Sequence, residues 1–190
     1  MPTAPPPPAA IVIAGGRSTR FGSDKLSAEV DGRSLLDRTI DSVAGCRPVV
    51  VVTGSEVRVA GHLVTVSEYP RWGGPCAALA AGVAAIDGGP TDVLIVAADL
   101  AHPDAAVAGL LATESGVLAG SDGRPQWLLA RAPLAALRDR CAELETDGGT
   151  AGRAARAIVG ELGLPLVDAA TDAIADIDVQ EDLDRMKENR

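Results

Sequence analysis

The fold of this chain is decided by the stretch Ala10-Ile-Val-Ile-Ala-Gly-Gly-Arg-Ser-Thr-Arg-Phe-Gly-Ser-Asp-Lys25. Its first five residues form an apolar run rich in β-branched side chains, which predicts a buried strand over residues 10–14. The chain then turns at Gly15 and Gly16 and continues through a basic loop to Lys25. Because glycine lets the backbone approach a ligand closely, successive N–H groups here can converge on an anion. The stretch therefore favours a strand and a phosphate-binding loop over a glycine-rich turn with solvated basic residues.

The two most common phosphate-binding loops do not match this stretch. A P-loop requires Lys-Ser or Lys-Thr directly after its last glycine, whereas Gly22 is followed by Ser23-Asp24-Lys25. A dinucleotide-binding fingerprint requires Gly-x-Gly-x-x-Gly, which the spacing of these glycines does not satisfy. The loop must belong to another class of phosphate site.

Residues 14–25 have an ordered pattern, Ala14-Gly-Gly-x-Ser-x-Arg-Phe-Gly-x-Asp-Lys25. This pattern resembles the signature of the molybdenum cofactor guanylyltransferase (MobA-like) family of nucleotidyltransferases, with Phe21 where that family usually has Met. The resemblance extends over roughly residues 10–186 and is weaker beyond the loop. It implies a Rossmann-like three-layer α/β/α fold with a mostly parallel sheet, of the GT-A-like nucleotidyltransferase type, and a nucleoside-triphosphate site.

The resemblance also implies particular site residues. Nucleotide-binding roles are implied for Ile13, Ala14, Gly15, Gly16, Lys25, Glu68, Gly74 and Asp99. Catalytic roles are implied for Arg20, Lys25 and Asp99, the two cations stabilising charge on the phosphates and leaving group. Neither histidine, His62 or His102, lies in a context that suggests a hydrolytic triad.

The stretch Ser67-Glu-Tyr-Pro-Arg-Trp-Gly-Gly-Pro75 contains two candidates for the position of an acidic residue that the resemblance places in contact with the nucleotide. The stretch is similar to the family's nucleotide-contacting acidic residue followed by Gly-Pro. The best alignment places Glu68 there, and Ser67 is the alternative because the loop length varies. Gly74-Pro75 would begin the helix beside the base, although Gly-Pro is also a common helix start in proteins without such a site.

Asp99 directly follows the apolar run of residues 93–98 and is the first candidate metal ligand. A carboxylate at the end of a buried strand requires a cation, backbone donors or water, and nucleotidyl transfer requires Mg²⁺ on the triphosphate. The resemblance implies that Asp99 holds this metal, and that Asp176 or Asp178 could contact the metal or the acceptor. Ala101-His102 departs from the family's usual proline and aromatic residue, and Asp99 could instead begin an ordinary turn before a helix. Asp178 could equally form a capping box with Glu181.

The remaining sequence predicts alternating strands and helices. Strands are expected at 48–52, 64–67, 92–97, 117–120, 126–130 and 164–167, and helices after Ser34 and at 74–86, 103–113, 133–141, 151–162 and 179–187. Such alternation predicts a mostly parallel sheet with helices on both faces and ligands beyond the carboxyl ends of the strands. Residues 122–129 resemble a strand pair that borders the family's acceptor pocket, although by composition they form only a hairpin-like turn with an exposed Trp127.

Composition limits the partners and the compartment. A chain of 190 residues suggests one domain over residues 9–190 after a proline-rich leader at 1–8. The net charge of −9 argues against a nucleic-acid surface. No apolar run reaches ~18 residues and no signal peptide is visible, so we expect a cytoplasmic protein without membrane contact. Three widely spaced cysteines fit a reducing compartment and give no metal cluster.

These observations predict a Mg²⁺-dependent transfer of GMP from GTP to a molybdopterin-type molybdenum cofactor, with release of pyrophosphate. The alternatives are cytidylyl transfer, guanylyl transfer to another small phosphorylated acceptor, and a catalytically silent nucleotide-binding protein. The sequence leaves the oligomeric state open, and a monomer is the simplest expectation.

Overall fold

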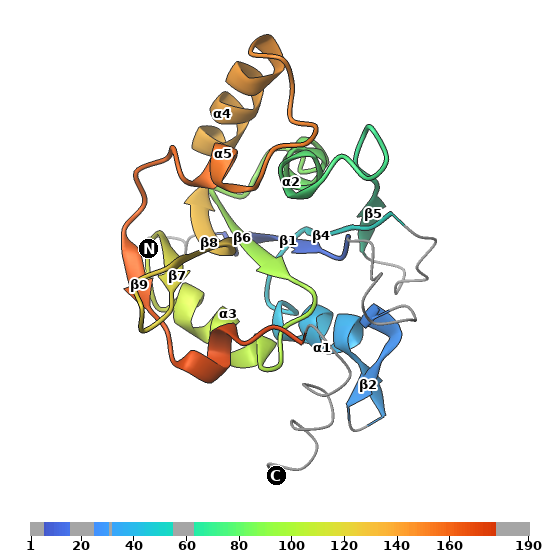
Figure 1. Ribbon diagram of the computed structural model, residues 1–190, viewed down its shortest axis with the longest axis vertical. Coiled ribbons are helices and arrows are strands. Elements are labelled where there is room, and N and C mark those ends of the chain that lie inside the picture. Colours follow the sequence, from blue (N-terminus) through green and yellow to red (C-terminus); the bar gives the residue numbers. More distant parts are fainter. Residues whose placement is uncertain (1–5, 16–24, 31, 55–62, 178–190) are drawn as a thin grey trace.

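A seven-stranded sheet forms the centre of the molecule, in the strand order β5-β4-β1-β6-β8-β7-β9 (Figure 1). The computed structural model describes residues 6–15, 25–30, 32–54 and 63–177. All strands of the sheet run in one direction except β8, which is antiparallel to both of its neighbours. The strands are β1 (Ala9–Ile13), β4 (Val49–Val52), β5 (Val64–Val66), β6 (Asp92–Ala97), β7 (Gly116–Ala119), β8 (Pro125–Pro133) and β9 (Leu166–Asp168).

Helices cover both faces of the sheet, so the expected three-layer α/β/α architecture is confirmed (Figure 1). One face carries α1 (Leu35–Ser42) and α3 (Pro103–Leu111), and the other carries α2 (Pro75–Ala84), α4 (Leu134–Thr146) and α5 (Arg156–Val159). Within β1, Ile11 and Ile13 pack toward α2 and α4, whereas Ala10 and Val12 pack toward α1 and α3. Both faces of β1 are therefore buried, which explains why its sequence is apolar throughout instead of alternating.

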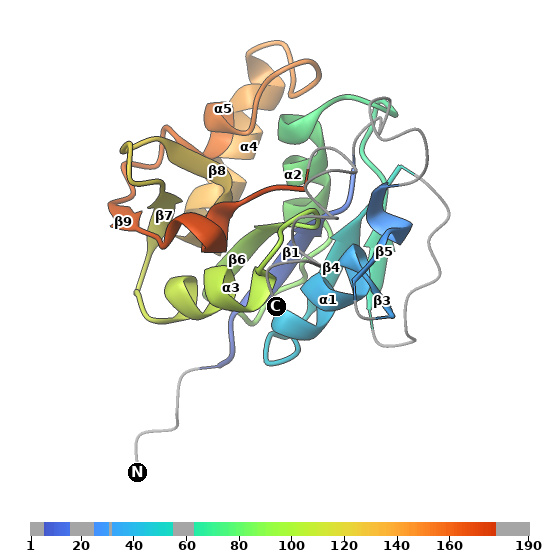
Figure 2. The same cartoon turned by 60° about the horizontal axis from the view of Figure 1, so that its bottom comes forward.

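A small hairpin, separate from the main sheet, lies beside α1 (Figure 2). It pairs β2 (Glu29–Val30) with β3 (Arg33–Ser34) in antiparallel register and follows the 3₁₀ helix Lys25–Ser27. As predicted, Ser34 caps α1: its hydroxyl oxygen accepts a hydrogen bond from the backbone N–H of Asp37 at 3.0 Å. This cap satisfies one of the donors that the first turn of a helix leaves unpaired.

Helix α2 lies close against β1 because its contacting residues are small. Gly82 shows how close this packing is, since a Cβ at this position would lie 2.5 Å from Cγ2 of Ile11 and 3.1 Å from Cγ2 of Val52. The helix begins at Pro75, directly after Gly74 with its φ of +91°. Proline suits a first helical position, where its missing N–H removes no hydrogen bond.

The direction of β8 determines which of its residues lie at the ligand-binding edge of the sheet. Because β8 is antiparallel, its first residues lie at the edge of the sheet where the parallel strands end, as the pairing of Leu129 with Val96 shows. The beginning of β8 therefore reaches the same edge as the loops after β1, β5 and β6. Strand β7 is antiparallel to β8 and pairs in parallel with β9, which is the last strand at that side of the sheet.

Three predicted segments differ in the structure. The helix expected at 151–162 is wrong for most of its length: only Arg156–Val159 forms α5, and the preceding residues are turns. Gly152, with a φ of +75°, donates its N–H to the carbonyl oxygen of Gly73, which ties this segment to the loop before α2. The helix expected at 133–141 and the strand expected at 126–130 both extend further, to Thr146 and Pro133. The helix expected at 179–187 and the first residues of the leader lie outside the described residues.

No helix in the described part of the chain is long and apolar enough to cross a membrane.

Candidate functional site

Three loops with candidate residues meet at the carboxyl edge of the parallel strands, and Glu68 and Gly74 share one of them. Gly15 follows β1, Glu68 follows β5, and Asp99 follows β6, while Gly74 precedes α2. In open α/β sheets this edge is where ligands bind, because neighbouring loops diverge there and leave a crevice. The structure thus brings together residues that are far apart in the sequence.

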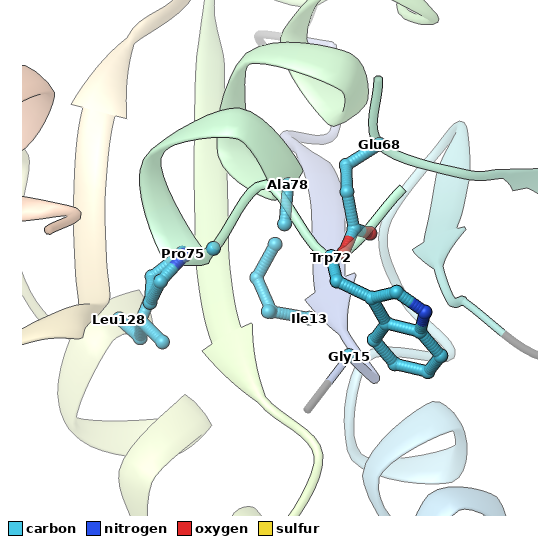
Figure 3. Close-up of a pocket in the computed structure, with 8 residues that line it drawn as sticks. Ile13, Gly15, Glu68, Trp72, Pro75, Ala78 and Leu128 are labelled. Carbon is cyan, nitrogen blue, oxygen red and sulfur yellow. The ribbon is translucent and has the colours of Figure 1, made fainter. Parts of the chain in front are cut away.

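The first cavity at this edge has a volume of about 180 Å³ and is called here the Glu68 cavity (Figure 3). It is lined by Ile13, Gly15, Glu68, Trp72, Gly74, Pro75, Ala78 and Leu128. Four of these eight are residues that the sequence predicts to contact nucleotide. Ala14 is different: it is buried beside the sheet, and its backbone N–H donates to the carbonyl oxygen of Val52 at 2.8 Å.

Glu68 is the polar centre of this cavity. Only 5% of the residue is exposed, and its Oε2 atom has no hydrogen-bond partner within the described part of the chain. A buried carboxylate oxygen without a donor is costly, so a ligand that supplies donors fits here. A Cβ on Gly15 would lie 3.7 Å from this oxygen, so the glycine leaves the approach to it open.

The structure separates the two candidates for the acidic position. Glu68 lines the cavity, whereas the hydroxyl of Ser67 donates to the carbonyl oxygen of Thr53 at 2.7 Å. Ser67 therefore ties the loop after β5 to the end of β4. This geometry favours Glu68 as the ligand-facing residue.

A second cavity, called here the Asp99 cavity, lies next to the first and has a volume of about 280 Å³. It is lined by Pro75, Ala97, Asp99, Pro125, Gln126, Trp127, Leu128, Leu129, Ala155 and Asp176. Pro75 and Leu128 line both cavities and so form the wall between them. The segment predicted to border an acceptor pocket, residues 122–129, supplies part of this lining through the beginning of β8.

Asp99 and Asp176 reach the Asp99 cavity through a short antiparallel pairing. Leu100 and Asp176 form a β-bridge. The backbone N–H of Ile177 donates to the backbone carbonyl oxygen of Asp99, and that of Ala101 to the carbonyl oxygen of Ala175, both at 2.9 Å. Two carboxylates from distant segments thus line one cavity, an arrangement that suits a divalent cation. The described residues contain no group of three or more metal-ligating side chains, so phosphate oxygens and water would have to complete the coordination. Asp178 lies outside the described residues.

The basic loop of the sequence contributes little that the structure describes. Gly16 and Arg20 lie outside the described residues. Lys25 begins the 3₁₀ helix Lys25–Ser27, and its side chain is likewise outside the described part.

Trp72, Ala78 and Leu128 line the Glu68 cavity without having been predicted to do so. Trp72 had a usable signal, because it is one of two tryptophans in the chain and immediately precedes Gly73-Gly74-Pro75. Leu128 lies in the segment 122–129 that was expected to border an acceptor pocket, but its place in the Glu68 cavity had no signal, because it depends on the direction of β8.

The three cysteines are free thiols with low reactivity. Burial raises the pKa of Cys46 and Cys76 and raises the pKa of Cys141 to about 11. Since the thiolate is the reactive form, these residues have the character of packing residues rather than nucleophiles.

The fold and the placement of these cavities define the class: the chain has an α/β nucleotidyltransferase fold. The chain belongs to the MobA-like NTP transferase domain family, which matches residues 10–166. The expected family is therefore confirmed.

Among curated relatives, a protein of Pyrococcus horikoshii named a probable molybdenum cofactor guanylyltransferase is 42% identical over 64 residues. This match covers 30% of the present chain and 33% of the relative, so the chain spans about a third of that protein's length.

Three solved structures show the same fold over nearly the whole chain. Molybdopterin-guanine dinucleotide biosynthesis protein A from Archaeoglobus fulgidus is 16% identical, with a TM-score of 0.67 and coverage of 95% and 97% of the two chains. The 2-C-methyl-D-erythritol 4-phosphate cytidylyltransferase of Thermus thermophilus is 21% identical, with a TM-score of 0.65 and coverage of 96% and 98%. The Mycobacterium tuberculosis protein Rv0371c, solved in complex with manganese, is 18% identical, with a TM-score of 0.60 and coverage of 97% and 100%. These likenesses show the fold alone.

Proposed function

We propose that this protein is a nucleotidyltransferase that transfers GMP from GTP to a molybdopterin-type molybdenum cofactor and releases pyrophosphate. The observation that carries the choice of nucleotide is the buried carboxylate of Glu68, whose Oε2 has no partner among the described residues. The names of the curated relatives support the choice of acceptor.

Glu68 favours guanine over cytosine because the two bases present different hydrogen-bonding edges. An ionised carboxylate only accepts hydrogen bonds. Guanine offers two neighbouring donors on its pairing edge, the ring N1–H and the exocyclic amino group, which match the two carboxylate oxygens. Cytosine offers one amino donor beside an acceptor nitrogen, so a second carboxylate oxygen would meet a lone pair. A site that leaves buried polar groups unpaired rejects the wrong base.

The Asp99 cavity is the proposed acceptor site. It shares the wall of Pro75 and Leu128 with the Glu68 cavity, so a nucleotide in one and an acceptor in the other would meet at their boundary. Trp127 and Leu128 give the lining apolar surface, and Gln126 adds an amide. A large planar acceptor with polar edges suits such a lining.

A divalent cation, which we propose to be Mg²⁺, would be held by Asp99 and Asp176, with Asp178 as a further candidate. The donor set fits, because Mg²⁺ prefers oxygen ligands and is commonly bound by one or two carboxylates together with substrate phosphates. Bound there, it would supply charge neutralisation to the triphosphate oxygens.

The reaction is an in-line substitution at the α-phosphorus. A phosphate oxygen of the acceptor forms the new P–O bond, the bond to the β-phosphate bridging oxygen breaks, and pyrophosphate leaves. The nucleophile is already ionised, so no side chain has to remove a proton. Arg20 and Lys25 stabilise the negative charge on the phosphates and the leaving group, and Glu68 fixes the base.

Calorimetric titration with GTP, CTP, ATP and UTP, each with and without Mg²⁺, tests the proposal. We expect GTP to bind more tightly than CTP by at least about tenfold, or ~1.4 kcal/mol. A preference for CTP would replace guanylyl by cytidylyl transfer, and the absence of binding by all four would overturn a nucleotide site. Binding of GTP without pyrophosphate release in the presence of molybdopterin cofactor would favour a catalytically silent protein or another phosphorylated acceptor.

A further inference from the structure

We propose that Trp72 is the aromatic surface on which the base of the nucleotide stacks, and that Gly54 and Arg71 hold it in place. The inference rests on the proposed function, since it assumes that the Glu68 cavity receives a base. It adds a residue that neither the sequence pattern nor the family match assigns.

Trp72 and Glu68 line the same cavity. The indole of Trp72 lies beside Gly15 and the Glu68 carboxylate (Figure 3). The residue is 41% exposed, so part of the indole can be reached by a ligand. An exposed aromatic ring next to a buried carboxylate offers the two contacts that a base makes: stacking on its face and hydrogen bonding at its edge.

The backbone of Trp72 has a costly conformation that the surrounding contacts maintain. Its φ is +65°, in the left-handed region that bulky residues rarely adopt. The guanidinium of Arg71 donates from Nε and Nη2 to the carbonyl oxygen of Gly54, at 3.1 and 2.5 Å. The same guanidinium carbon lies 5.4 Å from the centre of the indole ring. Backbone strain that neighbouring contacts over-determine is typical of ligand sites.

Gly54 allows the indole to lie directly against the loop after β4. A Cβ at this position would lie 3.0 Å from Cζ3 and 3.1 Å from Cη2 of the ring, closer than side chains pack. A residue larger than glycine would therefore require the indole to shift by a few tenths of an ångström. Contacts with Gly54 and Arg71 thus hold the indole plane of Trp72 in a fixed position.

Trp72 and Glu68 should contribute to nucleotide recognition in different ways. Stacking tolerates any base because every base has a π face, whereas the carboxylate distinguishes donor from acceptor edges. Trp72 should therefore raise the affinity for all nucleoside triphosphates, and Glu68 should set the ratio between GTP and CTP.

The test measures binding of three probes, GTP, CTP and inorganic tripolyphosphate, to the full chain and to Trp72→Ala. We expect the variant to bind GTP about tenfold more weakly and CTP by a similar factor, with the affinity for tripolyphosphate unchanged because that probe has no base. Trp72→Phe should recover most of the loss, because it restores an aromatic face. Tyr69→Ala is the matched control, since Tyr69 is 91% exposed in the same loop and should leave all three affinities unchanged.

Fluorescence gives a second readout. In a Trp127→Phe background Trp72 is the single tryptophan of the chain, and saturation with GTP should quench its emission. The inference is overturned if Trp72→Ala binds GTP within about twofold of the parent chain, if tripolyphosphate binding falls as much as GTP binding, or if the emission does not respond at saturation. If the parent chain itself binds no nucleoside triphosphate, the proposed function fails, and this inference fails with it.

Discussion

At the scale of single residues, Glu68 combines deep burial with an oxygen that has no hydrogen-bond partner among the described residues. Leaving a buried acceptor unsatisfied costs about 1–3 kcal/mol, and more for a charged group. Such a residue weakens the unliganded fold and strengthens a complex whose ligand supplies the missing donors. Removing its charge should therefore lower the affinity for GTP without lowering the stability of the unliganded protein.

Glu68→Gln tests this expectation. We expect affinity for GTP to fall by at least about tenfold, because the amide presents one acceptor where guanine requires two. The melting temperature of the unliganded protein should not fall, since an amide is less costly to bury than a carboxylate. Calorimetry and thermal unfolding measure the two quantities, with Glu114→Gln at an exposed position as the control. A variant that loses stability while keeping its preference for GTP over CTP would show that Glu68 is structural.

Asp99→Asn should remove Mg²⁺-dependent activity more than it weakens GTP binding measured without metal. The amide keeps the shape of the side chain but loses the charge that a divalent cation requires. Rates of pyrophosphate release across a Mg²⁺ titration provide the measurement, and Asp104→Asn, exposed in the first turn of α3, provides the control. An unchanged Mg²⁺ dependence would place the ligand elsewhere, with Asp176 the next residue to test.

At the scale of elements, the close contact between α2 and β1 positions the start of the helix. Gly74 and Pro75 line the Glu68 cavity, and Ile13 of β1 lines it from the strand. The small residue Gly82 permits this approach, because any side chain there would meet Ile11. The depth of the cavity therefore depends on how closely one helix lies against one strand.

Gly82→Ala should destabilise the protein by about 1–3 kcal/mol, the usual cost of overpacking a core. The added Cβ would lie 2.5 Å from Ile11, so the helix must move outward. Gly109→Ala in α3 is the matched control: its Cβ would lie 3.7 Å from Leu118, an ordinary contact, and alanine favours a helix over glycine. Urea unfolding measures both, and equal effects of the two substitutions would contradict the packing argument.

Arg131 joins the antiparallel strand β8 to β6 at the edge away from the site. Its Nη2 lies 3.1 Å from Oδ2 of Asp92, and its Nη1 donates to the carbonyl oxygen of Thr113. Both charged side chains are largely buried, unlike those of the exposed pair Arg33 and Asp41. The two pairs therefore differ in how strongly water screens them.

Asp92→Asn should cost about 1–2 kcal/mol of unfolding free energy, between the values typical of exposed and buried pairs. Asp41→Asn should cost less than about 1 kcal/mol, because that pair is exposed on both sides. Chemical denaturation of the two variants gives the comparison. An equal cost would show that the Arg131 pair contributes no more than a surface pair.

At the scale of the whole molecule, the Glu68 cavity is assembled from β1, the loop after β5, the start of α2 and the beginning of β8. A ligand that contacts all four holds together segments from both halves of the chain. Binding should therefore stabilise the entire sheet and not one loop, because a ligand that binds only the folded state shifts the unfolding equilibrium as a whole.

GTP with Mg²⁺ should raise the melting temperature. At a concentration of 100 times Kd the stabilisation is about 2.7 kcal/mol, which corresponds to roughly 5–10 °C for a domain of this size. Differential scanning fluorimetry across a GTP series measures the shift. Trp72→Ala should show a smaller shift at the same concentration, and no shift in the parent chain at millimolar GTP would contradict nucleotide binding.

Features that depend on neighbouring residues could be predicted from the amino-acid sequence. The apolar run of residues 10–14, the cap at Ser34 and the start of α2 after Gly74 were predicted from local patterns, and the alternation of strands and helices predicted the layered fold. Each of these is indicated by residue types and spacing within a few residues: a short apolar run, a hydroxyl before a helix, or Gly-Pro at a helix start. The same local reasoning was wrong for residues 151–162, where apolar spacing typical of a helix gives way to turns bonded to the loop before α2.

Features that depend on strand order and direction could be known only from the folded chain. The reversal of β8 brings Leu128 into the wall between the cavities, and the pairing of Leu100 with Asp176 brings a second carboxylate to the cavity of Asp99. Of the adjacent residues Ser67 and Glu68, only Glu68 lines the cavity, and the ring of Trp72 lies against Gly54. No pattern along the chain encodes these contacts, because each joins segments that meet only after the sheet has formed.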